Sequence, residues 1–359
     1  MPAARDERDE RDEPERALPR AETAAPADTA APCVILGQGG AARRPPRTPP
    51  PGVVTLVCPV RGCGAPLARV ESGPGRGLVC PRGHRFDLAR SGYCNLLQPQ
   101  DRRSRRPGDS AAALAARRRL FDRGLGDWLV PHLLAAFDEL RLPAGAAVLD
   151  VGCGEGFYLG TLARERDVEA HGLDISAAAI DLAARRYPQA SWVVANADRS
   201  LPYPAGGFDL ALSLTSRLHP PELRRVLRPP GHAALAPAAA AGAPGPPGAP
   251  VDGGGVLLIG VPGADDLVEL RAAVLGEGRL RDRLQPAVAA LAADFELVRQ
   301  TTARARLHLD AAAAQDLLAS TYRAGRERER RRAAGLAGLD VTASRDLAIF
   351  QPHPPPPPA

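Results

Sequence analysis

Short apolar runs separated by glycine-rich and polar stretches mark the central part of the chain. Residues 147–151 form such a run, and the glycines of 152–156 end it before a helix-like stretch at 158–164. Later runs predict four more strands, near 171–175, 192–196, 208–213 and 256–261. A strand, a glycine turn and a helix, followed by further strands, indicate an α/β fold of the doubly wound, Rossmann-like class.

Other segments lack any such pattern. Three segments can bury too little apolar surface to offset the loss of chain entropy on folding. They are the mixed-charge and Ala/Pro-rich N-terminal segment, the Ala/Gly/Pro-rich stretch after the fourth strand and the polyproline at the end of the sequence. We therefore divide the 359 residues into a disordered extension at 1–52, a metal-binding module at 53–100, an arginine-rich helical connector at 101–145, the α/β domain at 146–350 with a low-complexity insertion at 233–255, and a disordered proline-rich tail at 351–359.

The positive charge of the chain is carried by arginine alone. All 46 basic residues are arginine and the net charge is +5, but the distribution is uneven, with clusters at 102–123 and 323–332. Clustered arginine is an electrostatic footprint for phosphate, and a solvated helix face is the alternative for each cluster. The sequence opens without the basic and then apolar pattern of a secretory leader, and no apolar stretch of about 18 residues occurs. We expect a cytoplasmic protein without membrane contact.

Four residues have the spacing of a metal site. Cys58 and Cys63 form one pair, Cys80 and His84 form another, and sixteen residues rich in Gly and Pro separate the pairs. A pair of thiols and a pair made of a thiol and an imidazole together supply four ligands and leave no open coordination position. This set is typical of a closed, tetrahedral structural zinc site. The alternative is a chance cluster of buried thiols, and the wide C-x4-C spacing makes Cys63 the least certain ligand. A structural zinc ion would brace the module and take no part in chemistry.

The glycine turn carries the second candidate site. Asp150, Gly152, Gly154 and Gly156 form a D-x-G-x-G-x-G pattern, and Asp174 ends the next strand about twenty residues later, where an acid accepts ribose hydroxyls. A Rossmann-like domain with another ligand is the alternative. The pattern resembles motif I of the class I S-adenosylmethionine-dependent methyltransferases, which implies that the turn packs against the methionine part of the cofactor.

A longer resemblance joins the two sites. Residues 84–97, 103–110, 116–121 and 262–270, taken with the motifs above, look like the bacterial 23S rRNA (guanine-N1)-methyltransferases, a family that includes the tylosin-resistance type. The similarity runs from about residue 58 to 350, the insertion excepted. It implies a zinc module ahead of a class I methyltransferase domain, zinc and S-adenosylmethionine as cofactors, and methylation of guanine N1 in a hairpin loop of 23S rRNA, with macrolide resistance as a role.

Carried onto this chain, the family's zinc ligands fall on the two pairs above and its cofactor site on the glycine turn and Asp174. The family usually spaces its first pair as C-x2-C, which differs here. We add Asn196 as the adenine contact, and we expect RNA phosphates to contact a set of arginines: Arg85, Arg102, Arg103, Arg105 and Arg106. We name no catalytic base, because a lone His219 before two prolines is more often a loop residue.

Two alternatives to this function remain at this point. A methyltransferase for tRNA or a small molecule has the same fold, although small-molecule enzymes rarely need an arginine-rich zinc module. A non-catalytic RNA-binding protein that retains the fold belongs to a different class. A homodimer is also possible.

Overall fold

The computed structural model describes residues 54–70, 76–101, 108–214, 216–229, 254–276, 278–320, 331–332, 334–336 and 338–354. The predicted extension at 1–52, residues 233–253 of the predicted insertion and residues 355–359 of the predicted tail lie outside these residues. Residues 351 and 352 belong to strand β11 (Gly338–Pro352), which corrects the predicted start of the disordered tail at 351. None of the described helices is long and apolar enough to cross a membrane.

A three-stranded antiparallel sheet forms the N-terminal module. Its strands, in the order β1-β2-β3, are Ala68–Val70, Gly77–Val79 and Arg85–Asp87. Val57 and Pro66 add an isolated bridge in the loop that precedes it. Because the strands are so short, the module has little core of its own, and its buried residues belong to the same hydrophobic cluster as one face of the large sheet.

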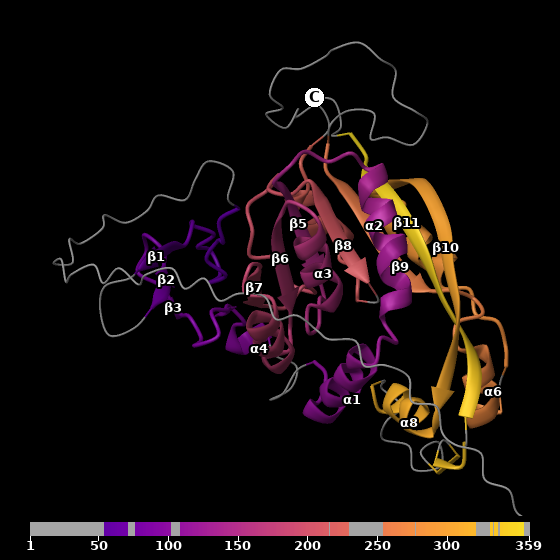
Figure 1. Cartoon of the computed structure of the whole chain (residues 1–359). Coiled ribbons are helices and arrows are strands. Elements are labelled where there is room, and N and C mark those ends of the chain that lie inside the picture. Colours follow the sequence, from indigo (N-terminus) through magenta and orange to yellow (C-terminus); the bar gives the residue numbers. More distant parts are fainter. Residues whose placement is uncertain are drawn as a thin grey trace, which may run out of the picture. The chain divides into compact units, whose positions relative to one another are not determined.

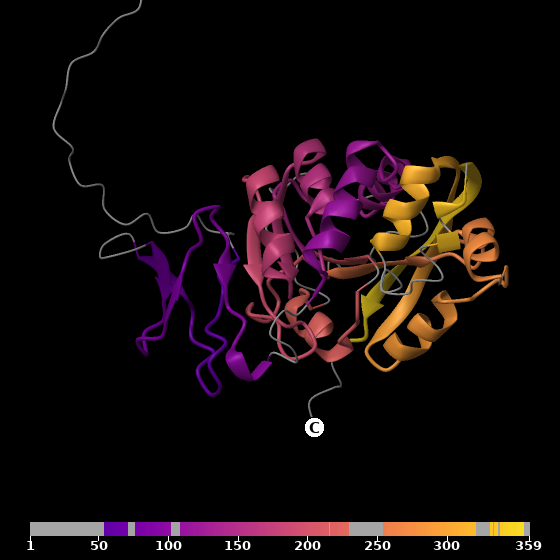
Figure 2. The ribbon, with the colours of Figure 1, turned by 90° about the horizontal axis from the view of Figure 1, so that it is seen from below.

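An eight-stranded sheet occupies the rest of the chain, in the order β10-β11-β9-β8-β5-β6-β7-β4 (Figure 1). Five parallel strands form its centre, and the apolar pattern predicts all five: β5 (Ala146–Val151), β6 (Val168–Asp174), β7 (Ser191–Val194), β8 (Leu210–Leu214) and β9 (Val256–Pro262). Apolar residues predominate in these strands because helices cover both faces of the sheet (Figure 2), although β6 also carries Glu169 and His171.

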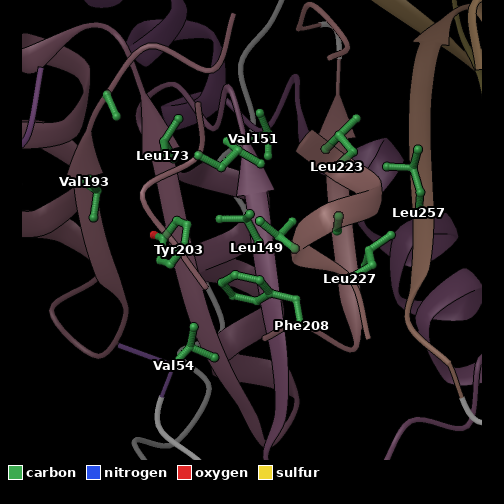
Figure 3. Packing of buried hydrophobic residues seen from close by; sticks show 14 of the residues in the cluster. Val54, Leu149, Val151, Leu173, Val193, Tyr203, Phe208, Leu223, Leu227 and Leu257 are labelled. Atoms are coloured by element: carbon green, nitrogen blue, oxygen red, sulfur yellow. The ribbon is translucent and has the colours of Figure 1, made fainter. Parts of the chain in front are cut away.

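Alternate residues of each central strand point to opposite faces. Leu149 faces a cluster with α5 (Pro220–Val226) and α7 (Leu284–Leu291), and Figure 3 shows its packing near Tyr203 and Phe208. Val148 faces the other cluster, whose helices are α2 (Val130–Glu139), α3 (Phe157–Glu165) and α4 (Ala177–Arg186). The period of two along a strand therefore divides the core into two layers.

Antiparallel pairing extends the sheet at one edge. The long strands β10 (Phe295–Asp310) and β11 (Gly338–Pro352) pair from Phe295–Pro352 to Asp310–Gly338, with an irregularity between Leu297 and Arg299. β11 pairs antiparallel with β9. The segment between β10 and β11 contains α8 (Ala311–Ala319). This helix packs in a third hydrophobic cluster with α1 (Ala111–Asp122) and α6 (Val268–Leu275). The apolar pattern did not predict this hairpin.

The other edge of the sheet belongs to the segment that leaves the N-terminal module. Strand β4 (Cys94–Asn95) pairs parallel with β7, and the Leu96 amide donates to the Val194 carbonyl at 2.9 Å. Two short 3-10 helices, η1 (Pro99–Asp101) and η2 (Asp127–Leu129), flank the connector helix α1. The chain thus crosses from module to sheet through backbone hydrogen bonds rather than through an unattached linker.

Candidate metal centre and cofactor site

The four predicted metal ligands meet at one point. Cys58 and Cys63 lie in the loop before β1, Cys80 follows β2 directly, and His84 precedes β3 directly. Their ligand atoms all lie within 4.8 Å of one another. The His84 Nδ1 atom lies 3.4 Å from the Sγ atoms of both Cys58 and Cys80, and the Cys63 and Cys80 sulfurs are 3.8 Å apart.

These separations fit a tetrahedral zinc ion. Zn–S bonds of about 2.3 Å and Zn–N bonds of about 2.0 Å at tetrahedral corners place two sulfurs about 3.8 Å apart and a sulfur and a nitrogen about 3.5 Å apart. Three thiols and one imidazole fill all four positions, so the ion has no place for substrate. The donor set and its spacing therefore fit structural zinc.

Glycine turns allow each pair to close. Gly62 and Gly83 precede the second ligand of each pair and have φ values of +72° and +84°, which residues with a side chain rarely adopt. In the second turn the Gly83 amide donates to the Cys80 carbonyl at 2.9 Å. Burial raises the pKa of the Cys80 thiol, but hydrogen bonds to its sulfur from the backbone amides of His84 and Arg82 and from the side chains of Cys63 and His84 together outweigh this effect and bring the pKa to about 7. The turn thus favours the thiolate that a metal requires.

The glycine turn after β5 forms the floor of the candidate cofactor site. Gly152, Gly154 and Gly156 have φ values of +76°, +56° and +73°. A Cβ on Gly152 would lie 2.3 Å from the Ser216 Cβ, and a Cβ on Gly156 would lie 2.3 Å from the Trp192 ring. Two of the three glycines therefore let strand β5 and helix α3 approach their neighbours closely.

Acidic groups surround this turn. Asp174 at the end of β6 accepts hydrogen bonds from the Gly154 amide at 3.0 Å and from the Ser176 amide at 2.8 Å. Asp150 is buried at the end of β5, where burial and then the charge of Asp174 raise its pKa to about 8. Among the described residues, the Oδ1 atom of Asp150 and both carboxyl oxygens of Glu155 are buried without a hydrogen-bond partner. Acceptors left unsatisfied at a glycine turn fit a ligand with donor groups, such as the ammonium and ribose hydroxyls of S-adenosylmethionine.

Asn196 has partners within the chain. Its side-chain amide donates to the Asp101 carbonyl at 2.8 Å, and its Oδ1 atom accepts from the Asp198 amide at 3.0 Å. The residue is buried at the end of the third predicted strand. It fastens the end of η1 beyond β7, so its assignment to the adenine ring stays a prediction.

The arginines of the connector divide into two groups. Arg102, Arg103, Arg105 and Arg106 lie outside the described residues. The arginines of α1 form ion pairs within the chain, where Arg119 contacts Asp316 at 2.5–2.9 Å and Arg123 contacts Asp310 at 2.7–3.1 Å. These two fasten α1 to the α8 region, and phosphate contact by the segment 102–123 stays a prediction.

Comparison with known proteins follows the same division of the chain. A zinc-ribbon model described as "RlmA, N-terminal" matches residues 56–105, and a model described as "Methyltransferase domain" matches residues 148–231. A Streptomyces fradiae protein named "23S rRNA (guanine(748)-N(1))-methyltransferase" is 35% identical over 309 residues, which cover 83% of this chain and 97% of that protein. A Micromonospora griseorubida protein named "Putative 23S rRNA (guanine-N(1)-)-methyltransferase" is 31% identical over 322 residues, with the same coverages of 83% and 97%.

The chain belongs to the 23S rRNA (guanine-N1)-methyltransferase family. This confirms the predicted family and the class I methyltransferase fold with its zinc module. It also confirms the two cofactors, S-adenosylmethionine and zinc. When bound, S-adenosylmethionine supplies an electrophilic methyl group.

Hydroxyl groups line the end of β8 in this family member. The Ser216 hydroxyl donates to the Val151 carbonyl at 2.8 Å and lies 2.8 Å from the Ser213 hydroxyl. The His219 Nδ1 atom accepts from the Glu222 amide at 3.4 Å and caps α5, so this histidine is a helix-capping residue rather than the loop residue that the sequence predicts. The catalytic base stays unassigned.

Sequence reasoning missed two residues of the turn region. Glu155 lies between two of the motif glycines, and an acid inside a glycine turn is the signal that could have identified it. Arg117 belongs to a charged cluster that we read only as a whole, although its guanidinium lies against Gly154. Its role depends on the packing of α1, which no local motif reveals.

Proposed function

We propose that this chain transfers a methyl group from S-adenosylmethionine to N1 of a guanine in a hairpin loop of 23S rRNA. The observation that carries the proposal is the joining of the zinc module to the methyltransferase sheet by β4–β7 pairing. An arginine-bearing module and a cofactor turn are thereby parts of one compact unit. A small-molecule methyltransferase has no need of such an attachment.

The surface of the module suits a polyanion. Exposed arginines are spread over it, and among the described residues from 54 to 95 the one carboxylate is Asp87, which lies 3.8 Å from Arg85. The exposed set is Arg61, Arg69, Arg76, Arg82, Arg85 and Arg90. Arginine binds phosphate oxygens through several N–H donors, so this surface supports RNA contact.

The reaction requires removal of the guanine N1 proton and stabilisation of the charge that moves onto O6. Positioning of N1 in line with the methyl group contributes most of what this chain can supply, because the described residues of 213–218 at the end of β8 offer two serine hydroxyls and no carboxylate. Asp174 holds the turn through the Gly154 amide and orients the donor site. We propose that the protein acts in the cytoplasm, where its ribosomal substrate is found.

The test is transfer of tritium from labelled S-adenosylmethionine to undermodified ribosomal RNA, followed by nuclease mapping. Label on N1 of one hairpin guanine supports the proposal, and position 748, named for the Streptomyces fradiae relative, is the first to examine. Label on tRNA alone would replace the substrate. Tight RNA binding without label would favour the non-catalytic alternative. A variant with Asp174→Asn provides the matched control, because it alters the cofactor site and leaves the zinc module intact.

Two finer expectations accompany this function. Resistance to a tylosin-type macrolide stays a prediction, checked by inhibitory concentrations in a sensitive host with and without the gene. The homodimer that the sequence allows is checked by light scattering on the purified chain.

A further inference from the structure

Arg117 on helix α1 lies directly over the cofactor turn. A Cβ on Gly154 would lie 3.5 Å from the Arg117 Nη1 atom, which is the single neighbour of that position within 4 Å among the described residues. The side chain is three-quarters buried and pairs through Nη2 with Asp109 at 2.7 Å and with the Ser320 carbonyl at 3.2 Å. The Nη1 atom of the guanidinium thus faces the glycine turn, while the Nη2 atom is bound by Asp109 and the Ser320 carbonyl.

The helix that carries Arg117 is fixed at both ends. The Ser110 hydroxyl accepts from the Ala113 amide at 3.1 Å and caps the first turn. Arg119 and Arg123 pair with Asp316 and Asp310 in the α8 region. Because these bonds set the position of α1, the guanidinium is placed over Gly154 before any ligand arrives.

The charges around the turn suit the two ends of an amino acid. The acidic groups Asp150, Glu155 and Asp174 suit the ammonium of the methionine part of the cofactor, and its carboxylate needs a cation. Gly108, at φ +86°, brings Asp109 and the start of α1 close to Ser176, which lies two residues after Asp174, the predicted ribose-binding residue. The α1 segment therefore covers the carboxyl ends of β5 and β6, where a cofactor binds.

We propose that Arg117 binds the α-carboxylate of S-adenosylmethionine through the guanidinium edge that faces Gly154. This inference rests on the proposed function, because it names a contact to the cofactor which that function uses. Asp109 acts as a positioning residue that holds the opposite edge of the guanidinium. The role differs from the phosphate contact that the sequence suggested for this arginine cluster.

The experiment compares two ligands that differ by the amino-acid part. Isothermal titration of the full zinc-loaded chain with S-adenosylhomocysteine, and then with 5′-methylthioadenosine, which lacks the carboxylate, is performed on the wild type and on Arg117→Gln. In Arg117→Gln, loss of a charge-assisted hydrogen bond is expected to lower the affinity for S-adenosylhomocysteine about 10- to 100-fold. The affinity for 5′-methylthioadenosine should change by about twofold or less.

Two further variants separate this contact from a structural role. Arg119→Gln breaks the Asp316 pair on the same helix without touching the turn, and we expect it to leave the affinities for both ligands within about twofold of the wild type. Arg117→Lys retains charge and should recover part of the affinity for S-adenosylhomocysteine alone. This second variant also serves if Arg117→Gln folds poorly, as judged by zinc content and thermal unfolding.

The outcomes are distinguishable. An equal loss for both ligands in the Arg117 variants would show that the residue only supports the fold, and unchanged affinity for S-adenosylhomocysteine would show that it does not contact the carboxylate. Either result overturns this inference and leaves the proposed function intact. A wild-type chain that binds neither ligand would overturn both.

Discussion

Replacement of Gly152 by alanine should destabilise the methyltransferase domain through two separable effects. At φ +76°, an alanine costs about 1–2 kcal/mol of unfolding free energy. Its Cβ would lie 2.3 Å from the Ser216 Cβ and 2.8 Å from the Ser216 Oγ. Relief of this overlap requires a shift at the end of β5 or β8 and adds about 1–3 kcal/mol. We expect a total loss of about 2–5 kcal/mol in urea unfolding followed by circular dichroism.

Gly206 provides the matched control. Its φ is +68°, but a Cβ there would meet the Pro229 Cδ atom at an ordinary contact distance of 3.5 Å. Gly206→Ala should therefore cost the backbone part alone, about 1–2 kcal/mol. A double variant, Gly152→Ala with Ser216→Gly, removes the overlapping side chain and should recover the excess loss, less about 1 kcal/mol for the hydrogen bond to the Val151 carbonyl.

The comparison of these variants tests the steric reasoning. If Gly152→Ala and Gly206→Ala lose the same free energy of unfolding, the approach of the turn to Ser216 does not matter. If the Ser216→Gly change worsens the Gly152→Ala variant, the two residues do not collide as the geometry requires.

Three other changes have expected outcomes. Cys63→Ser should reduce bound zinc well below one per chain by metal analysis, because all four ligands meet; full zinc content would exclude Cys63 as a ligand. Asp150→Asn should make the free energy of unfolding depend less on pH. The pKa of Asp150 is about 8 in the folded state and lies above the value of about 4 in the unfolded state. The contribution of Asp150 to stability is therefore complete below about pH 4 and is lost as pH rises to 8, at up to about 1.4 kcal/mol per pH unit. Urea midpoints at pH 5 and 8 check this, and equal slopes in both proteins would contradict it. Arg85→Ala should lower rRNA affinity and reduce the slope of log affinity against log salt by about one. An unchanged slope in filter binding would remove Arg85 from the interface.

The sequence predicts the central sheet well because each strand is a local signal. The runs that became β5 and β9 are short, mostly apolar and bounded by glycine or polar residues, so neighbouring residues suffice to identify them. The hairpin of β10 and β11 has no such signal. Its first strand is mostly exposed and rich in arginine, and its partner follows only after α8. Pairing over that distance depends on the tertiary fold.

The residues of the candidate metal and cofactor sites also divide into those that local sequence predicts and those that depend on the tertiary fold. Ligand pairs and motif glycines are specified by spacing within a few residues, and the structure brings them together. Asn196 and Arg117 depend instead on partners far away in sequence, at Asp101 and Ser320. A residue type indicates what a side chain can bind, but only packing decides which partner it meets.

The parallel pairing of β4 with β7 has a practical consequence for anyone who shortens the chain. A fragment that starts at the apparent domain boundary near residue 101 would lose Cys94 and Asn95 and would leave the amide and carbonyl groups of β7 without their neighbour. Such an edge is a template for association with other chains, and the adjacent Trp192 and Val193 are apolar. A methyltransferase fragment intended to remain monodisperse should therefore begin before Cys94, with the last residues of the zinc module retained as part of the catalytic sheet.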